Sequence, residues 1–183
     1  MQQQFIIPST IDQPAKHIAP ASGNFHPVTV KPIWQSDFAV AHAQILSRSF
    51  KHFTQRDLVP GNLPAAELSR FLFEAPFALL SHGTQADPVL NYGNQTALAL
   101  WEMGWDEFTR MPSRLTAEAP NREERARILA AVAMRGFAGD YSGVRISKSG
   151  RRFEIARATI WNLRAEDGNF HGQAAMFDRW ELI

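Results

Sequence analysis

The last part of the chain consists of three extended runs that are separated by two short glycine-containing turns. The runs cover residues 137–147, 151–164 and 170–180, and the turns contain Gly150 and Gly168. Connections as short as these join strands that run in opposite directions. The sequence therefore predicts a three-stranded antiparallel meander at this end of the chain.

A second pair of extended runs lies earlier and ends at a polar corner. Residues 77–83 and 88–92 are short apolar runs bounded by Gly, Asp and Pro, which predicts a β-hairpin. Asn94 is a good N-cap for a helix over residues 95–103, and Gly93 can adopt the unusual backbone angles of a sharp corner. We expect Asn94 to satisfy backbone groups there; the alternative is that its side chain reaches into a ligand cavity.

Two amphipathic segments precede the hairpin. After a cap at Ser36 or Asp37, apolar residues recur at helical spacing as far as Phe53, and Pro64 begins a second helical face that ends at Pro76. The apolar faces of both segments predict packing against a sheet. The alternative is an intermolecular helix pair that forms a homodimer through the first segment.

A longer helix is expected between the hairpin and the meander. It covers residues 122–135, with Asn121 as its cap and Gly136 as its stop, and the proline-broken stretch 105–120 before it predicts short helical turns. The predicted fold class is therefore α+β. A five-stranded antiparallel sheet carries helices over one face, is preceded by two N-terminal helices, and leaves a cavity between sheet and helices.

The composition divides the chain into two parts. Prolines and glutamines recur over residues 1–33, which predicts an extended or disordered arm. Residues 34–183 are long enough for one domain with a sizeable core. We expect its N-terminal helices in residues 34–75 and its sheet core in residues 76–183.

Charge and composition exclude several classes of protein. The 183 residues carry a formal net charge of +1 with acidic and basic residues interspersed, so no nucleic-acid partner is expected. The absence of cysteine excludes disulfides, thiolate catalysis and cysteine-bound metal. No apolar run approaches the roughly 18 residues of a membrane span, and the N-terminus lacks an export signal. We therefore expect a cytoplasmic protein without membrane contact.

Five short motifs taken together resemble the MEKHLA domain family. They are SHGT at 81–84, NYGN at 91–94, MPSRLTAE at 111–118, DYSGVRIS at 140–147 and GQAA at 172–175. The resemblance covers residues 34–180. Members of that family are similar to PAS domains and occur alone in bacteria or at the C-terminus of plant class III homeodomain-leucine zipper regulators; this chain resembles the stand-alone bacterial type. The resemblance implies a PAS-like domain that binds small ligands or proteins and relays the bound state, with no defined chemistry.

The resemblance raises flavin as a cofactor, which the residues do not favour. Light-sensing PAS domains carry a reactive cysteine followed by arginine where MPSR places Ser113 and Arg114, and serine cannot form the flavin-thiol adduct. Gln173 lies where such domains direct a glutamine at the flavin ring, so binding without an adduct stays open. The alternative is that Gln173 is an ordinary strand glutamine.

The histidines do not favour haem, metal or hydrolase chemistry. Haem would need His52, His82 or His171 as an axial ligand, and a single histidine near a strand is more often structural. The histidines are scattered, without HxH or HxxxH, so no metal site is expected. Ser81 and His82 are neighbours on a strand and point to opposite faces, which excludes a nucleophile and base pair.

Aromatic residues, Phe153 and Phe177 among them, are spread over the elements that surround the expected cavity. The predicted ligand-binding residues are Trp101, Trp105, Phe108, Met111, Arg114, Tyr141, Arg145, Trp161, Gln173 and Met176. The alternative is that the aromatic side chains form an ordinary core. A buried arginine must be paired, and we expect either Asp140, Glu118 or an acidic ligand as the partner.

Two functions are carried forward from the sequence. The first is a non-enzymatic PAS-like sensory or protein-interaction module that binds a small hydrophobic or aromatic ligand and pairs with itself or another protein through its N-terminal helix. The second is a small α+β enzyme or carrier for a hydrophobic acid. In that case Arg145 or Arg114 would clamp the acid and His82 would serve as the base.

Overall fold

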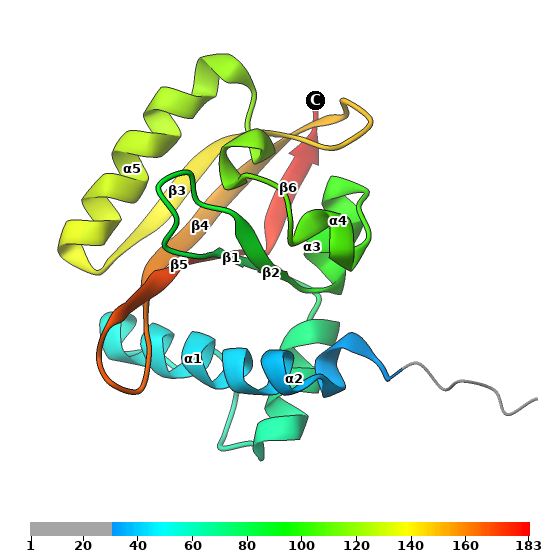
Figure 1. Ribbon diagram of the computed structural model, residues 1–183. Coiled ribbons are helices and arrows are strands. Elements are labelled where there is room, and N and C mark those ends of the chain that lie inside the picture. Colours follow the sequence, from blue (N-terminus) through cyan, green and yellow to red (C-terminus); the bar gives the residue numbers. More distant parts are fainter. Residues whose placement is uncertain (1–30) are drawn as a thin grey trace, which may run out of the picture. The chain divides into compact units, whose positions relative to one another are not determined.

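A computed structural model describes residues 31–183, which form one unit around a single antiparallel sheet (Figure 1). The expectation of an extended arm falls mainly on residues 1–30, outside the described part. The strands are β1 (Ala78–His82), β2 (Leu90–Gly93), β3 (Phe137–Ile146), β4 (Arg152–Arg164), β5 (Phe170–Phe177) and β6 (Arg179–Leu182). Their order is β2-β1-β5-β4-β3, so the predicted hairpin joins the predicted meander where β1 pairs with β5.

The sheet has six strands, one more than predicted, because the last extended run divides at Asp178. The β5 and β6 strands both pair antiparallel with β4, and the register is the same on either side of the division. Arg157 of β4 has a φ of 54°, a left-handed conformation that interrupts regular pairing in this region. The sixth strand is therefore a continuation of β5 along β4.

Within residues 31–183, five α-helices pack around the sheet. They are α1 (Asp37–Thr54), α2 (Ala65–Glu74), α3 (Gln95–Trp101), α4 (Trp105–Phe108) and α5 (Arg122–Arg135), with 3-10 turns η1 (Ile33–Gln35), η2 (Ser113–Thr116) and η3 (Ala119–Asn121). Ser36 caps α1 as predicted, since its Oγ accepts from the Ala39 amide at 3.1 Å. Asn121 makes no capping hydrogen bond, because the η3 turn leads directly into α5. No described helix is long and apolar enough to cross a membrane.

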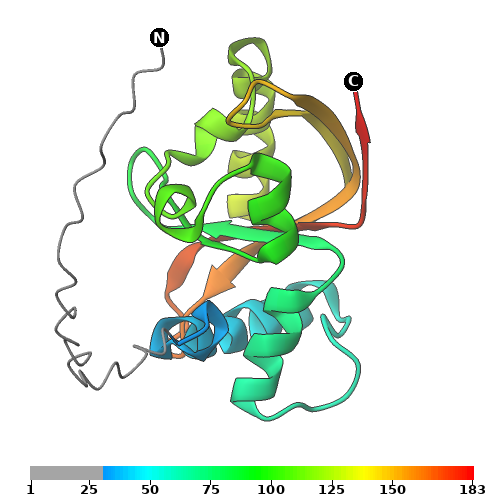
Figure 2. The same cartoon turned by 90° about the vertical axis from the view of Figure 1, so that its right-hand side faces the viewer.

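Helices cover both faces of the sheet, where the sequence predicted one covered face. Figures 1 and 2 show α1 and α2 on one side of the sheet and α3 and α5 on the other. The short α4 lies beside β2 at the edge of the sheet. Every residue of β1 is buried, as a strand between two layers requires. The expectation that the N-terminal helices pack against a sheet is therefore correct.

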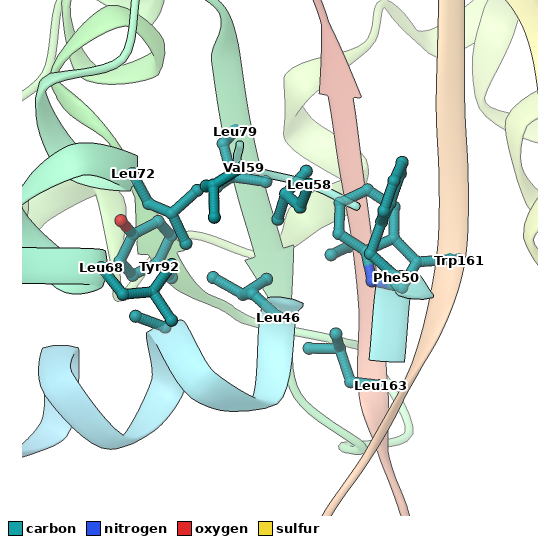
Figure 3. Close-up of a cluster of buried hydrophobic side chains, with 12 residues drawn as sticks. Leu46, Phe50, Leu58, Val59, Leu68, Leu72, Leu79, Tyr92, Trp161 and Leu163 are labelled. Atoms are coloured by element: carbon teal, nitrogen blue, oxygen red, sulfur yellow. The ribbon is translucent and has the colours of Figure 1, made fainter. Parts of the chain in front are cut away.

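The core beneath α1 and α2 joins both helices to the sheet (Figure 3). Leu46 and Phe50 of α1, Leu72 of α2, and Trp161 and Leu163 of β4 belong to one buried cluster. The Phe50 and Trp161 rings lie edge to face with centroids 5.0 Å apart, a favoured aromatic geometry. The apolar stripe of α1 is thus buried inside the chain.

The core on the opposite side is built from aromatic residues of α3, α4 and the sheet. Trp101 of α3 packs edge to face against Phe153 of β4 at 5.2 Å, and it also meets Phe108 and Phe177 in the same geometry. Leu80 of β1 belongs to the same cluster. The two cores are separated by the sheet backbone, and strands β1, β2, β4 and β5 contribute to both by alternation.

Asn94 joins three elements at the corner after β2. Its Oδ1 accepts from the amides of Leu79 and Ala97, each at 3.0 Å, and its Nδ2 donates to the carbonyls of Phe77 at 2.7 Å and Leu72 at 3.2 Å. The side chain is fully buried. Asn94 therefore caps α3 and also satisfies backbone groups of α2 and β1, which agrees with the architectural role expected for it.

Gly93 is required at the corner for space, a different reason from the one predicted. Its φ lies outside the left-handed region, so backbone strain does not select glycine. A Cβ at this position would lie 2.5 Å from the ring of Phe108. Only glycine lets α4 pack this closely against β2.

Replacing Asn94 by alanine should destabilise the domain by about 3 kcal/mol, since four buried backbone groups lose their partner at about 0.5–1.5 kcal/mol each. Asn94→Asp should cost at least as much, because a carboxylate retains the two acceptor contacts but cannot donate to carbonyl groups. Urea unfolding measures both. Asn169→Ala, in an exposed turn, is the matched control and should change the free energy of unfolding by less than about 0.5 kcal/mol. A loss at Asn94 no larger than this control would contradict the role assigned to it.

Candidate functional site

A small cavity lies between α5 and the face of the sheet opposite to α1 and α2. Its volume is about 40 Å³, and its walls come from α3, η2, α5 and strands β1, β3, β4 and β5. Most of the wall is apolar, with Leu80, Trp101 and Phe177 among its members. Since one water needs about 10–15 Å³ of such space, the cavity has room for about three waters.

Arg145 projects from β3 into this cavity and is 6% exposed. Its Nη1 donates to the Val144 carbonyl at 2.8 Å, and its Nη2 donates to the Tyr141 hydroxyl at 3.2 Å. The guanidinium also lies 5.3 Å from the centre of the Tyr141 ring, within the range of a cation–π contact. These contacts are all with neutral groups.

Neither acidic partner expected for Arg145 is in place. Glu118 instead pairs with Arg152 at 2.8 Å. Asp140 forms no ion pair within the described part of the chain, and its φ of 56° is left-handed. The buried charge of Arg145 is therefore without a carboxylate partner among the described residues.

A second arginine, Arg125 of α5, lines the same cavity and was missed by the sequence analysis. Among residues 31–183 it forms neither a hydrogen bond nor an ion pair. Burial, and then repulsion from Arg145, lower the pKa of Arg125 to about 10. The signal was present in the sequence, because Arg125 precedes Ile128 and Leu129 by three and four residues and so lies on the same helix face.

Three of the ten predicted ligand-binding residues line the cavity: Trp101, Tyr141 and Arg145. Phe108 and Met111 belong to the core on this side of the sheet but do not line the cavity. The structure therefore brings together two aromatic residues and one arginine of the predicted set.

Trp105, Trp161 and Met176 lie on the other side of the sheet, in the core beneath α1 and α2, which contradicts their expected place around the cavity. For Trp161 and Met176 the reason is strand alternation, whereas Trp105 lies in α4 and packs against Tyr92 of that core. Ile160 and Ala175 face the cavity, so the residue that follows each of them faces α1.

Arg114 lies on the surface and has no place in the cavity. Its Nε lies 3.0 Å from Asp87 Oδ2, and about half of its side chain is exposed. Ser113 beside it is buried in η2 but is not part of the cavity wall. Arg114 therefore pairs with a residue that the sequence analysis did not assign to it.

Gln173 holds α5 to the sheet. Its Nε2 donates to the Leu129 carbonyl at 2.9 Å and to Asn162 Oδ1 at 3.0 Å. Asn162 Nδ2 in turn donates to the carbonyls of Val132 and Ala133, at 3.0 and 3.1 Å. The last carbonyls of a helix lack partners within it, so Asn162 satisfies the end of α5, and Gln173 contacts the helix about one turn earlier at Leu129.

The cavity does not fit flavin or haem. Ligand pockets for molecules of that size enclose about 300–1,000 Å³, whereas this one has about 40 Å³. Both amide protons of Gln173 bind within the protein, so that side chain is not free to face a flavin ring. The residues present therefore do not accommodate either group in this conformation.

The histidines are dispersed over both sides of the sheet. His82 faces α5, and its Nδ1–H donates to the Gly83 carbonyl, 2.9 Å away. Burial lowers the pKa of His82, the hydrogen bond to Gly83 opposes this shift, and the charge of Arg125 adds to the lowering. His52 is exposed on α1. No cluster of metal-binding side chains occurs in the described residues.

Ser81 and His82 point to opposite faces of the sheet, as expected, and Ser81 forms a hydrogen bond with His42 instead. Its hydroxyl donates to Asn91 Oδ1 at 2.6 Å and lies 2.8 Å from His42 Nε2, so the His42 Nε2–H is the donor to Ser81. Both Ser81 and His42 are at most 2% exposed beneath α1. A substrate has no access to this pair, which serves to join α1 to the hairpin.

The strand order and helix placement define the PAS fold, and solved structures agree. A PAS domain from Colwellia psychrerythraea matches 64% of this chain and 94% of its own, with a TM-score of 0.55 and 13% identity. An RNA-binding light-oxygen-voltage receptor matches 67% of this chain and 35% of its own, with a TM-score of 0.54 and 18% identity. At such identities the likeness shows the fold.

The MEKHLA domain pattern matches residues 40–182, and the chain therefore belongs to the MEKHLA domain family. The homeobox-leucine zipper protein ATHB-14 of Arabidopsis thaliana is 28% identical over 190 residues, which cover all of this chain. The chain spans 22% of the length of that plant protein. The resemblance recognised from the sequence motifs is confirmed.

His42 predicts a pH dependence of stability. Burial, and then the charge of His171, lower its pKa from 6.5 to about 3. The unfolded chain binds this proton below pH 6.5 and the folded chain does not, so stability falls as the pH drops from 6.5 towards 3. At pH 5 the loss due to His42 should be about 2 kcal/mol relative to pH 7.

Urea unfolding between pH 5 and 7 tests this expectation. Because the pKa of His82 is lowered as well, the relevant comparison is the slope of His42→Gln against that of the unmodified chain. His52→Gln, exposed on the same helix, is the control and should keep the original slope. An unchanged slope in His42→Gln would show that the lowered pKa is not the cause.

Proposed function

We propose that this domain is a non-enzymatic PAS-like sensory or protein-interaction module that binds a small ligand in the cavity beneath α5. The observation that carries the proposal is the cavity itself, which combines an apolar wall with the guanidinium groups of Arg125 and Arg145. An apolar pocket with a few convergent polar groups is the usual form of a small-molecule site. We further propose a cytoplasmic location, in keeping with a chain without cysteine.

Apart from its hydrogen bonds to Asn162 and Gln173, the α5 helix that covers the cavity buries few side chains, which supports a role in responding to a ligand. Val132 is the one residue of α5 that is fully buried, and Ile128 and Leu129 are half-buried. A helix with so little buried area can shift at a lower cost than α1, which buries six residues. We propose that ligand binding changes the position of α5 and that a partner protein reads this change.

Thermal unfolding with added probes tests ligand binding. Indole, propionate and propionamide sample aromatic, acidic and neutral ligands, and at least one should raise the melting temperature. Ala158→Leu and Ala175→Val fill the cavity wall and should abolish the shift, while Ala126→Leu, exposed on α5, should preserve it. If no probe acts on the unmodified chain, and its absorption spectrum shows protein alone, the domain is an interaction module without a ligand.

The enzyme or carrier alternative retains Arg145 but loses two of its parts. Arg114 is paired with Asp87 outside the cavity, and His82 is not part of the cavity wall. His82→Gln would stop turnover while leaving affinity unchanged if this alternative held. We favour the sensory module because no base reaches the ligand space among the described residues.

We also propose the predicted homodimer through residues 36–53, although its original basis, an exposed apolar stripe on α1, is lost. The apolar stripe on which the prediction rested packs against the sheet. The exposed side of α1 carries Phe38 among charged residues such as Arg48 and Lys51, so a dimer would use this mixed surface. Sedimentation at increasing concentration should reveal the dimer, and a monomer mass throughout would exclude it.

A further inference from the structure

The polar groups of the cavity offer more hydrogen-bond donors than acceptors. Arg125 forms no hydrogen bond among the described residues, and Arg145 uses only part of its donor fork, on Val144 and Tyr141. The Tyr141 hydroxyl accepts from Arg145 and has no recorded acceptor of its own. The hydroxyl of Thr116, also in the wall, is occupied because it donates to the Ser113 carbonyl at 2.8 Å. Among the wall residues the two guanidinium groups therefore offer more donors than the Tyr141 and Thr116 hydroxyls can accept.

Two guanidinium groups of like charge in one apolar cavity are costly. Each loses hydration, and each raises the electrostatic energy of the other, since no described carboxylate pairs with either. Seven other ion pairs show that this chain pairs its surface charges readily. Glu118 follows the η2 turn, which contributes Thr116 to the cavity wall, but its carboxylate pairs with Arg152 and not with Arg145. The arrangement is stabilised if a third, negative charge enters.

We infer that the cavity binds the carboxylate of a short monocarboxylic acid, with Arg125 and Arg145 on the carboxylate and the carbon chain against the apolar wall. This inference rests on the proposed function, because it names the ligand class of the same cavity. Arginine suits the role, since its planar fork matches the two oxygens of a carboxylate.

The size and composition of the cavity select this class over other anions. A volume of about 40 Å³ holds about three water-sized groups, which corresponds to a carboxylate with one or two further carbons. Ile155, Ala158 and Ile160 of β4 give the remaining atoms an apolar surface. An inorganic anion such as phosphate would gain the arginines but would place polar oxygens against this surface, which is unfavourable.

Titration of the full chain with propionate, propionamide and phosphate tests the inference by calorimetry. Propionamide has nearly the same shape without the charge. Propionate should bind at least tenfold more tightly than either of the other two, as expected when a charged hydrogen-bonded contact of about 1.4 kcal/mol or more is lost. Arg125→Gln and Arg145→Met should each weaken propionate binding by tenfold or more. Arg127→Gln, exposed on α5, is the control and should leave the affinity unchanged.

The melting temperature without ligand separates a binding role from a structural one. Arg125→Gln removes a half-buried charge that has no hydrogen-bond or ion-pair partner among the described residues, so it should raise the melting temperature of the ligand-free domain by about 2–4 °C. A structural arginine would lower it when replaced. Arg125→Gln also remains informative if Arg145→Met fails to fold.

The outcomes distinguish this inference from the proposed function. Equal binding of propionate and propionamide, or full affinity in both arginine variants, would overturn the carboxylate site and leave a neutral-ligand sensor. Tighter binding of phosphate would overturn the monocarboxylate and retain an anion site. Absence of binding by these three probes and by indole would overturn both proposals.

Discussion

The side chain of Asn94 is the contact on which both halves of this domain depend. It is a buried amide that accepts from β1 and α3 and donates to the end of α2 and to the residue before β1. Its donors and acceptors are all used, and water cannot replace a partner that is removed. Since α2 belongs to one core and α3 to the other, one side chain fixes the relative positions of the two layers across the sheet.

Local patterns allowed most elements to be predicted from the sequence, because caps, glycine turns and apolar periodicity act over a few residues. Ser36, Asn94 and Gly136 act at helix ends as expected. The division of the last run at Asp178 was missed, since it follows from backbone geometry beside Arg157 that no residue type announces. Asn121 failed as a cap because the preceding turn already directs the chain into the helix.

The assignment of residues to faces was less predictable, because it depends on which layer each strand meets. Alternation places Ile160 and Trp161 on opposite sides, but the sequence alone does not say which side holds the cavity. The sequence analysis expected one face of the sheet to be open, but α1 and α2 cover it, so large aromatic residues such as Trp161 fill the core on that face as well. Arg125 was missed for a related reason: a charged residue on the apolar face of a helix was not weighed as part of the site.

Of the five tryptophans in the chain, Trp101 and Trp161 are the ones that are fully buried, and they lie in different cores. The indole nitrogen of each has no recorded partner. Trp101 contributes to the cavity wall, whereas Trp161 contacts Phe50 beneath α1. Indole emission depends on the polarity around the ring, so the domain carries an intrinsic optical reporter on each side of its sheet. Two chains that each keep one of these rings and lack the other four tryptophans would allow events in the cavity and events at α1 to be followed separately in time.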